Sequence, residues 1–134
     1  MKKVTIIAMF SLSFQLQAIS QNTFLYEFKT SLSYEEAYKN SVLAISYSPN
    51  YTIKSQDKSL NLILADWVYS AGIACIACEF KFTSDNGATA IKIKFEKTPR
   101  CKGSLKRKNT DPVVIKLKEL IPDLQGGEIT EQKE

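Results

Sequence analysis

The sequence predicts an α+β fold, a two-layer sandwich in which two helices cover one face of an antiparallel sheet of about four to five strands. Three observations predict it. Two stretches carry apolar residues at helical spacing, several stretches alternate apolar with polar residues, and an Asn-Gly pair joins two of the alternating stretches. Each helix has one apolar stripe to bury, which a sheet face can cover. The predicted order is β-α-β-β-β-β-α, and the other sheet face is left to solvent or a partner.

The first strand and the first helix follow from local patterns. Phe24–Thr30 alternates aromatic with charged residues, as a half-buried strand does. Ser33 followed by Glu36 is a capping box, in which each side chain satisfies a free backbone donor at a helix start. The apolar spacing that follows predicts a helix over Tyr34–Tyr47, and Pro49 prevents its continuation.

The middle of the chain reads as two strands and an ambiguous connection. Tyr51–Lys54 is a short strand, followed by a polar turn over residues 55–59. Leu60–Tyr69 is apolar on both faces, which indicates a central strand. Residues 70–77 are small and contain a glycine, so they form either a loop or a bulged strand end.

A β-hairpin is predicted over Cys78–Thr83 and Thr89–Glu96. Asn86-Gly87 is a typical two-residue hairpin turn, because both positions need a positive φ. This turn places apolar residues opposite each other on one face and charged residues on the other, so two independent patterns agree on one register. The predicted pairs are Phe82 with Ile91, Phe80 with Ile93, and Cys78 with Phe95.

A second helix is expected to begin at Asp111, with Asp as its cap and Pro112 at its first position. Its apolar stripe continues to Leu124, and Pro122 bends or ends it. Residues 125–134 are predicted to be a flexible polar tail. Residues 21–124 therefore form one domain, since neither a linker nor a repeat interrupts them.

Residues 1–20 resemble a secretory signal peptide. Lys2 and Lys3 precede an apolar run that is too short to span a membrane, and Ala18 and Ser20 are the small residues of a cleavage site. We expect cleavage after Ser20, with Ala18 as the second choice; a buried N-terminal helix is the alternative. The predicted location is the bacterial periplasm or the extracellular space, with no transmembrane segment after cleavage.

The charge of the mature chain is small but uneven. Without Lys2 and Lys3 the 18 basic side chains become 16, against 14 acidic ones, a net charge of +2. Between residues 97 and 108 no acid occurs, and this stretch is either an anion-binding loop or a solvated one. Nucleic-acid binding is not predicted, because no aromatic residue interrupts this stretch. The anion-binding candidates are Lys97, Arg100, Lys102, Lys106, Arg107 and Lys108.

Cys75, Cys78 and Cys101 allow three interpretations. Cys75-x-x-Cys78 resembles a thiol–disulfide motif, but a strand follows it where a redox motif needs a helix N-terminus. A metal site would have to recruit a carboxylate as a further ligand. The extended hairpin register places Cys75 opposite Thr98, close to Cys101. We favour a structural Cys75–Cys101 disulfide with Cys78 buried and free, although an intermolecular bond stays open.

The chain has no histidine, which excludes Ser-His-Asp and Cys-His catalysis and every His-liganded metal site. Asp66, beside Trp67 in an apolar strand, is the most interesting acid, but no second carboxylate lies at a readable spacing. The sequence therefore predicts no catalytic residue, no metal site and no cofactor.

Three segments carry a resemblance to a known type of domain: Ser33–Tyr38, Tyr51–Lys58 and Leu60–Asp66. Within residues 24–96 the pattern resembles small secreted domains, many from Bacteroidetes, with a TATA-binding-protein-like or helix-grip fold. The repeated domains of the lipoprotein of the outer-membrane β-barrel assembly machine are another example, although this chain lacks the lipidated Cys. The resemblance implies an exported binding or assembly module of the bacterial envelope, with another envelope or secreted protein as its partner.

Overall fold

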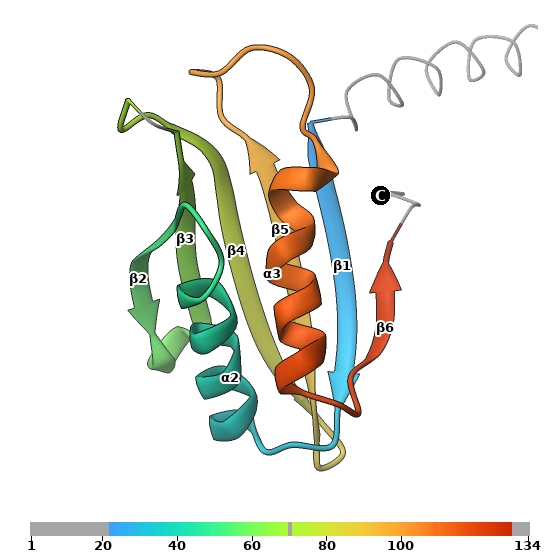
Figure 1. Ribbon diagram of the computed structural model, residues 1–134. Coiled ribbons are helices and arrows are strands. Elements are labelled where there is room, and N and C mark those ends of the chain that lie inside the picture. Colours follow the sequence, from blue (N-terminus) through green and yellow to red (C-terminus); the bar gives the residue numbers. More distant parts are fainter. Residues whose placement is uncertain (1–21, 70, 130–134) are drawn as a thin grey trace, which may run out of the picture.

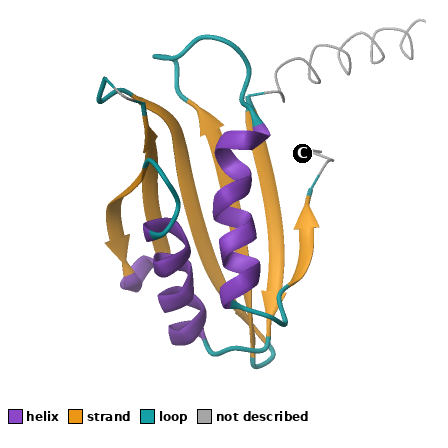
Figure 2. Ribbon diagram, viewed as in Figure 1, coloured by secondary structure: helices purple, strands orange, loops and turns teal. Residues whose placement is uncertain are grey.

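A computed structural model of the protein describes residues 22–69 and 71–129. They form one six-stranded antiparallel sheet in the order β2-β3-β4-β5-β1-β6, and two helices lie on the same face of it (Figures 1 and 2). The α+β class is confirmed. The predicted signal peptide over residues 1–20 lies outside the described residues. The elements are β1 (Thr23–Thr30), α2 (Tyr34–Ser46), β2 (Tyr51–Asp57), the 3-10 helix η1 (Lys58–Leu60), β3 (Leu62–Val68), β4 (Ala74–Asp85), β5 (Ala88–Lys97), α3 (Arg107–Leu120) and β6 (Gln125–Glu128).

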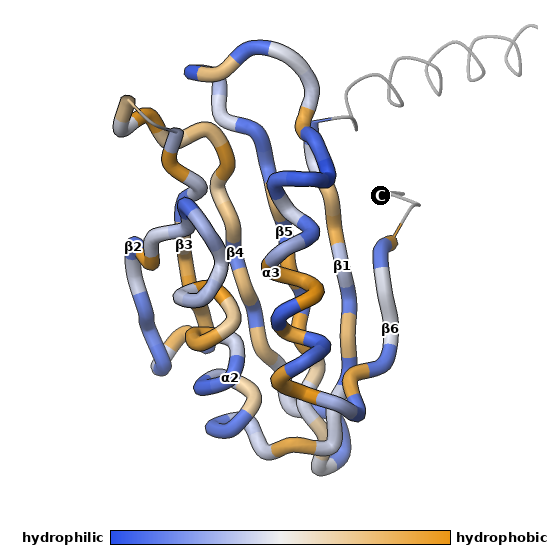
Figure 3. Tube along the Cα trace, viewed as in Figure 1, coloured by the Kyte–Doolittle hydropathy of each residue, from blue (hydrophilic) through white to orange (hydrophobic). Residues whose placement is uncertain are grey.

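The predicted hairpin register is confirmed over β4 and β5. Asn86 and Gly87 both have positive φ, and the three predicted apolar pairs face each other. Alternation of the strand side chains places these apolar residues under the helices, while charged residues line the opposite face. The same alternation is visible along β1, the neighbour of β5 in the sheet (Figure 3). The hairpin therefore forms the centre of the sheet.

The predicted strand count and element order are wrong because the tail contains a strand. Residues 125–128 form β6 on the outer edge of β1, with Gly126 opposite Phe28. A Cβ on Gly126 would clash with the Glu27 carbonyl oxygen, and the φ of +121° at Gly126 favours glycine. The composition Gln-Gly-Gly-Glu reads as a loop, but the glycine permits the close approach that pairing requires. The rest of the predicted tail, residues 130–134, lies outside the described residues.

The second helix also differs from its prediction. α3 begins at Arg107, four residues before the expected cap, and ends at Leu120. Pro112 lies inside it and cannot donate to the Lys108 carbonyl. Tertiary contacts set this start, since Thr110 is fully buried and the Tyr51 hydroxyl donates to the Asn109 carbonyl at 2.8 Å.

Smaller differences concern the strand ends. β2 continues to Asp57 through the predicted polar turn, and η1 follows it with Asp57 as its cap. β4 begins at Ala74, so the ambiguous stretch 70–77 is in its second half a strand that pairs with β3 and β5. α2 begins as predicted, with the Ser33 hydroxyl accepting from the Glu36 N–H, and ends one residue early at Ser46.

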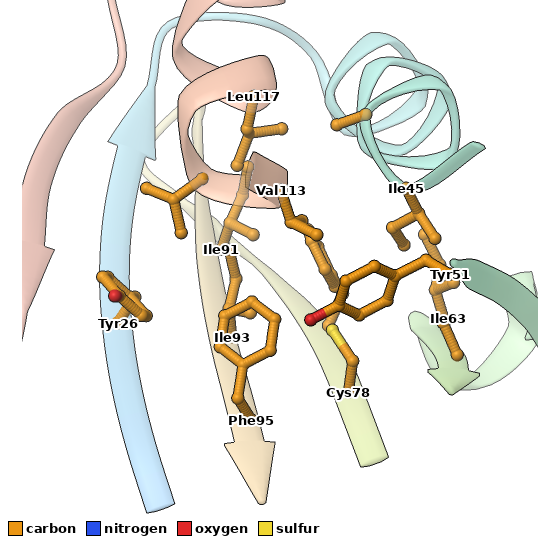
Figure 4. Close-up of a cluster of buried hydrophobic side chains, with 14 of the residues drawn as sticks. Tyr26, Ile45, Tyr51, Ile63, Cys78, Ile91, Ile93, Phe95, Val113 and Leu117 are labelled. Carbon is orange, nitrogen blue, oxygen red and sulfur yellow. The ribbon is translucent and has the colours of Figure 1, made fainter. Parts of the chain in front are cut away.

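The core lies between the sheet and the two helices. Its largest fully buried side chains come from both the sheet and the helices. Figure 4 shows Val113 and Leu117 of α3 and Ile45 of α2 above residues of the sheet. No buried side-chain nitrogen or oxygen in the described part of the chain lacks a hydrogen-bond partner. None of the helices over residues 22–69 and 71–129 has the length and apolar character needed to cross a membrane.

Asp123 joins the turn after α3 to the connection between β1 and α2. Its carboxylate accepts from the Ser31 hydroxyl at 2.5 Å, the Thr30 hydroxyl at 2.7 Å and the Ser31 N–H at 3.0 Å. These hydrogen bonds lower the pKa of Asp123 to about 2. The charged carboxylate therefore ties the segment after α3 to the segment that leads into α2.

The pKa of Asp123 predicts an acid-dependent loss of stability. A depressed native pKa stabilises the fold above the unfolded pKa of about 4, and this contribution disappears as pH falls toward 2. Asp123→Asn should therefore be less stable than the parent at pH 7, and the difference should shrink toward pH 2. Urea unfolding at both pH values measures it. The control is Glu27→Gln, which removes an exposed carboxylate from the open face of the sheet. A stability difference for Asp123→Asn that does not change with pH would contradict the assignment.

The close approach at β6 predicts different effects for two neighbouring glycines. Gly126→Ala should destabilise the protein by about 1–3 kcal/mol, because the new Cβ meets the Glu27 carbonyl in a left-handed backbone. Gly127→Ala, where a Cβ meets nothing within 4 Å, is the matched control and should change little. Denaturant midpoints compare the two variants. Equal effects would mean that β6 is not held against β1 as described.

Candidate functional site

A pocket of about 490 Å³ opens at the end of the sheet where β3 stops and β4 begins. The loop between β5 and α3 and the first turn of α3 supply the other lining residues. Both segments lie at this end of the sheet in Figure 1. We call it the basic pocket. It is lined by Trp67, Tyr69, Cys75, Ile76, Lys97, Cys101, Lys102, Ser104, Leu105, Lys106, Lys108 and Asn109.

The predicted disulfide holds the loop that lines the pocket. Cys75 in β4 is bonded to Cys101, with 5.4 Å between their Cα atoms. Thr98 donates from its N–H to the Cys75 carbonyl at 3.0 Å and from its hydroxyl to the Ala74 carbonyl at 2.7 Å. The Lys97 ammonium donates to the carbonyls of Thr98 and Cys101. One wall of the pocket is therefore fixed by a covalent bond and by these hydrogen bonds.

The charged side of the pocket is entirely cationic. Four lysines line it, and the described lining includes no aspartate or glutamate. Lys102, Lys106 and Lys108 are exposed, and none of them forms a salt bridge within the part of the chain that the structure describes. Lys97 is held by the loop carbonyls, so the other three lysines are the ones available to a ligand.

The first turn of α3 adds to the positive potential. No side chain caps this helix and its first turn carries no acid. Lys106 is the N-cap residue, and Arg107 and Lys108 begin the first turn, which is hydrophilic in Figure 3. Cations at a helix N-terminus oppose the helix dipole, which favours anions at that end. Such a conflict with local preference is typical of a functional site.

The six predicted anion-binding residues separate into three groups. Lys97, Lys102, Lys106 and Lys108 line the pocket, whereas Arg100 does not. Arg107 turns away: it pairs with Glu128 at 2.8 Å and lies 4.4 Å from the centre of the Phe24 ring. The hydrogen bond to Glu128 raises the pKa of Arg107. Arg107 therefore fastens α3 to the β1–β6 edge.

Two aromatic residues in the pocket were missed by the sequence analysis. Trp67 and Tyr69 have ring centres 5.6 Å apart, and Tyr69 is 57% exposed. The stretch 97–108 itself has no aromatic residue, but the fold supplies Trp67 from β3 and Tyr69 from the residue after its end. Their spacing of two residues places both on one face of a strand, and this was the available signal.

The remaining chemical candidates lie apart from the pocket lining. Cys78 is buried and unbonded, as predicted, and faces the Tyr51 hydroxyl in the core (Figure 4). Burial raises the pKa of the Cys78 thiol, which disfavours the thiolate. Asp66 alternates with the helix-facing Ala65 and Trp67, so it belongs to the open face. No group of three Cys, Asp or Glu residues in the described ranges could hold a metal ion.

No protein-family model matches the chain, and no curated protein matches its sequence significantly. Among solved structures, Ara h 8.0201 is similar with a TM-score of 0.52 and 12% identity, over 73% of this chain and 90% of that one. TTHA0849 from Thermus thermophilus has a TM-score of 0.39 and 12% identity, over 73% and 95% of the two chains, which is too low to support an argument. The first likeness shows the fold alone. The resemblance to secreted Bacteroidetes-type domains stays a prediction.

The cysteine arrangement predicts a defined pattern of thiol alkylation. The folded protein should not react, because two cysteines are bonded and Cys78 is buried. Without reductant, denaturant should expose one thiol per chain, and reduction should expose all three. Intact mass after alkylation counts them. A reactive thiol in the folded protein, or three without reductant, would contradict this arrangement.

Proposed function

We propose that the protein is an exported, non-enzymatic binding module of the bacterial envelope that takes an anionic ligand at the basic pocket. The observation that carries the proposal is a concave site with four lysines and no acidic residue in its described lining. A single-sign pocket focuses the electrostatic field on its mouth and attracts a ligand of opposite charge. The uncapped, cationic start of α3 supports the same ligand charge.

Export rests on two supports of different kinds. The first twenty residues have the three-part pattern of a signal peptide. The Cys75–Cys101 disulfide suits an oxidising compartment such as the periplasm. The non-enzymatic part rests on the sequence, which has neither a histidine nor a complete catalytic motif.

The geometry favours this function over a thiol–disulfide activity. Cys75 is paired with Cys101 rather than with Cys78, and burial disfavours the thiolate at Cys78. The attacking thiolate of a redox motif needs an accessible, electropositive environment. Insulin reduction that disappears in Cys78→Ser would support the redox alternative instead.

The proposal predicts salt-sensitive binding to a polyanion through the pocket lysines. The parent should be retained on heparin, and the triple variant Lys102→Ser, Lys106→Ser, Lys108→Ser should lose retention. The slope of log affinity against log salt should fall by about one for each lysine removed. Arg107 is left intact, because its loss would also break the Glu128 ion pair.

The control removes the same charge from the open face of the sheet. Lys81→Ser, Lys92→Ser, Lys94→Ser removes three lysines from a surface where Glu79 and Glu96 lie within 4 Å of Lys94. Both triple variants have the same net charge, so a difference in their heparin retention shows which of the two surfaces binds heparin. Equal retention of the two would overturn the assignment to the basic pocket.

A further inference from the structure

We propose that the natural ligand of the basic pocket is a small amphipathic organic anion, with one anionic group attached to a planar aromatic body. This inference rests on the proposed function and names the class of its ligand. It combines three features of the same site: its size, its aromatic wall and its separate cationic rim.

The aromatic wall points to the body of the ligand. Tyr69 is a large side chain left 57% exposed beside Trp67, at a ring-centre distance of 5.6 Å. Buried Ile76 and Leu105 also contribute to the lining. A planar ring stacked against this wall would remove apolar and aromatic surface from water. An inorganic anion, or a polyanion without apolar groups, would leave that surface exposed.

The cationic rim points to the headgroup. Lys102, Lys106 and Lys108 are exposed, and they come from the loop and from the first turn of α3, whereas Trp67 lies in β3 and Tyr69 directly follows it. The two kinds of surface thus lie on different elements around one pocket. A ligand that satisfies both must itself have an apolar part and an anionic part.

The size of the pocket limits the ligand. A volume of about 490 Å³ lies within the range of sites for small organic molecules, roughly 300–1,000 Å³. The Cys75–Cys101 bond and the Thr98 hydrogen bonds hold the lining loop, so part of the site is formed before the ligand arrives. Preformed sites lose less freedom on binding.

The test uses three probes that separate the two parts of the ligand. 1-Anilinonaphthalene-8-sulfonate has both rings and charge, N-phenyl-1-naphthylamine has the same rings without the sulfonate, and inorganic sulfate has the charge alone. Trp67 is the single tryptophan of the chain, so quenching of its emission reports binding near the pocket. The sulfonated dye should bind about tenfold or more tightly than the neutral dye, as one charge-assisted contact allows. Sulfate should compete only weakly with the sulfonated dye for the pocket.

Variants assign the signal to the pocket. The triple variant Lys102→Ser, Lys106→Ser, Lys108→Ser should bind the sulfonated dye only as weakly as the neutral dye. Tyr69→Ser should weaken both dyes, because it removes part of the aromatic wall. The open-face triple lysine variant should weaken neither. Near-ultraviolet circular dichroism checks that each variant keeps its packed core, since partly folded proteins also bind such dyes.

The outcomes separate the two proposals. Lysine-dependent heparin retention together with equal binding of the two dyes, or with no quenching, would overturn this inference and leave the proposed function standing. If the folded parent neither is retained on heparin nor binds the dyes, the proposed function and this inference are both overturned. Preference for the sulfonated dye that disappears in the pocket variant and survives in the open-face variant supports both.

Discussion

The Asn86-Gly87 turn constrains the rest of the molecule, because it fixes the register of the two longest strands. Both residues adopt the positive φ that a two-residue hairpin turn requires. A shift of one residue would move Phe80 and Phe82 to the charged face and Lys81 into the core. The register also continues to the far end of the hairpin, where it brings Cys75 opposite Thr98 and within bonding distance of Cys101.

The helical layer is held to this sheet by contacts between distant parts of the chain. The Tyr51 hydroxyl of β2 reaches the Asn109 carbonyl, Arg107 reaches Glu128 of β6, and Asp123 reaches the connection after β1. The first two contacts fasten the same end of α3 that borders the basic pocket. The position of the pocket wall therefore depends on both edges of the sheet.

Local signals made part of this structure predictable. The Ser33 cap, the Asn-Gly turn and the alternation of β1, β4 and β5 act between near neighbours, and each is confirmed. β6 and the start of α3 depend on tertiary contacts: Gly126 fits against Glu27, and Thr110 is buried. A pattern of nearby residues does not contain such information. The lysines of the pocket were visible as a charge run, whereas Trp67 and Tyr69 join them only through strand order.

The strand conformation of β4 also decides which cysteines can be oxidised together. Cys75 and Cys78 are three residues apart in β4, so along an extended strand their Cα atoms are about 10 Å apart. A disulfide needs Cα atoms closer than about 7 Å. In an unfolded chain the two thiols could meet, but once β4 has formed they cannot. A bond between Cys75 and Cys78 would therefore require β4 to be disrupted, whereas the Cys75–Cys101 bond is compatible with the intact sheet.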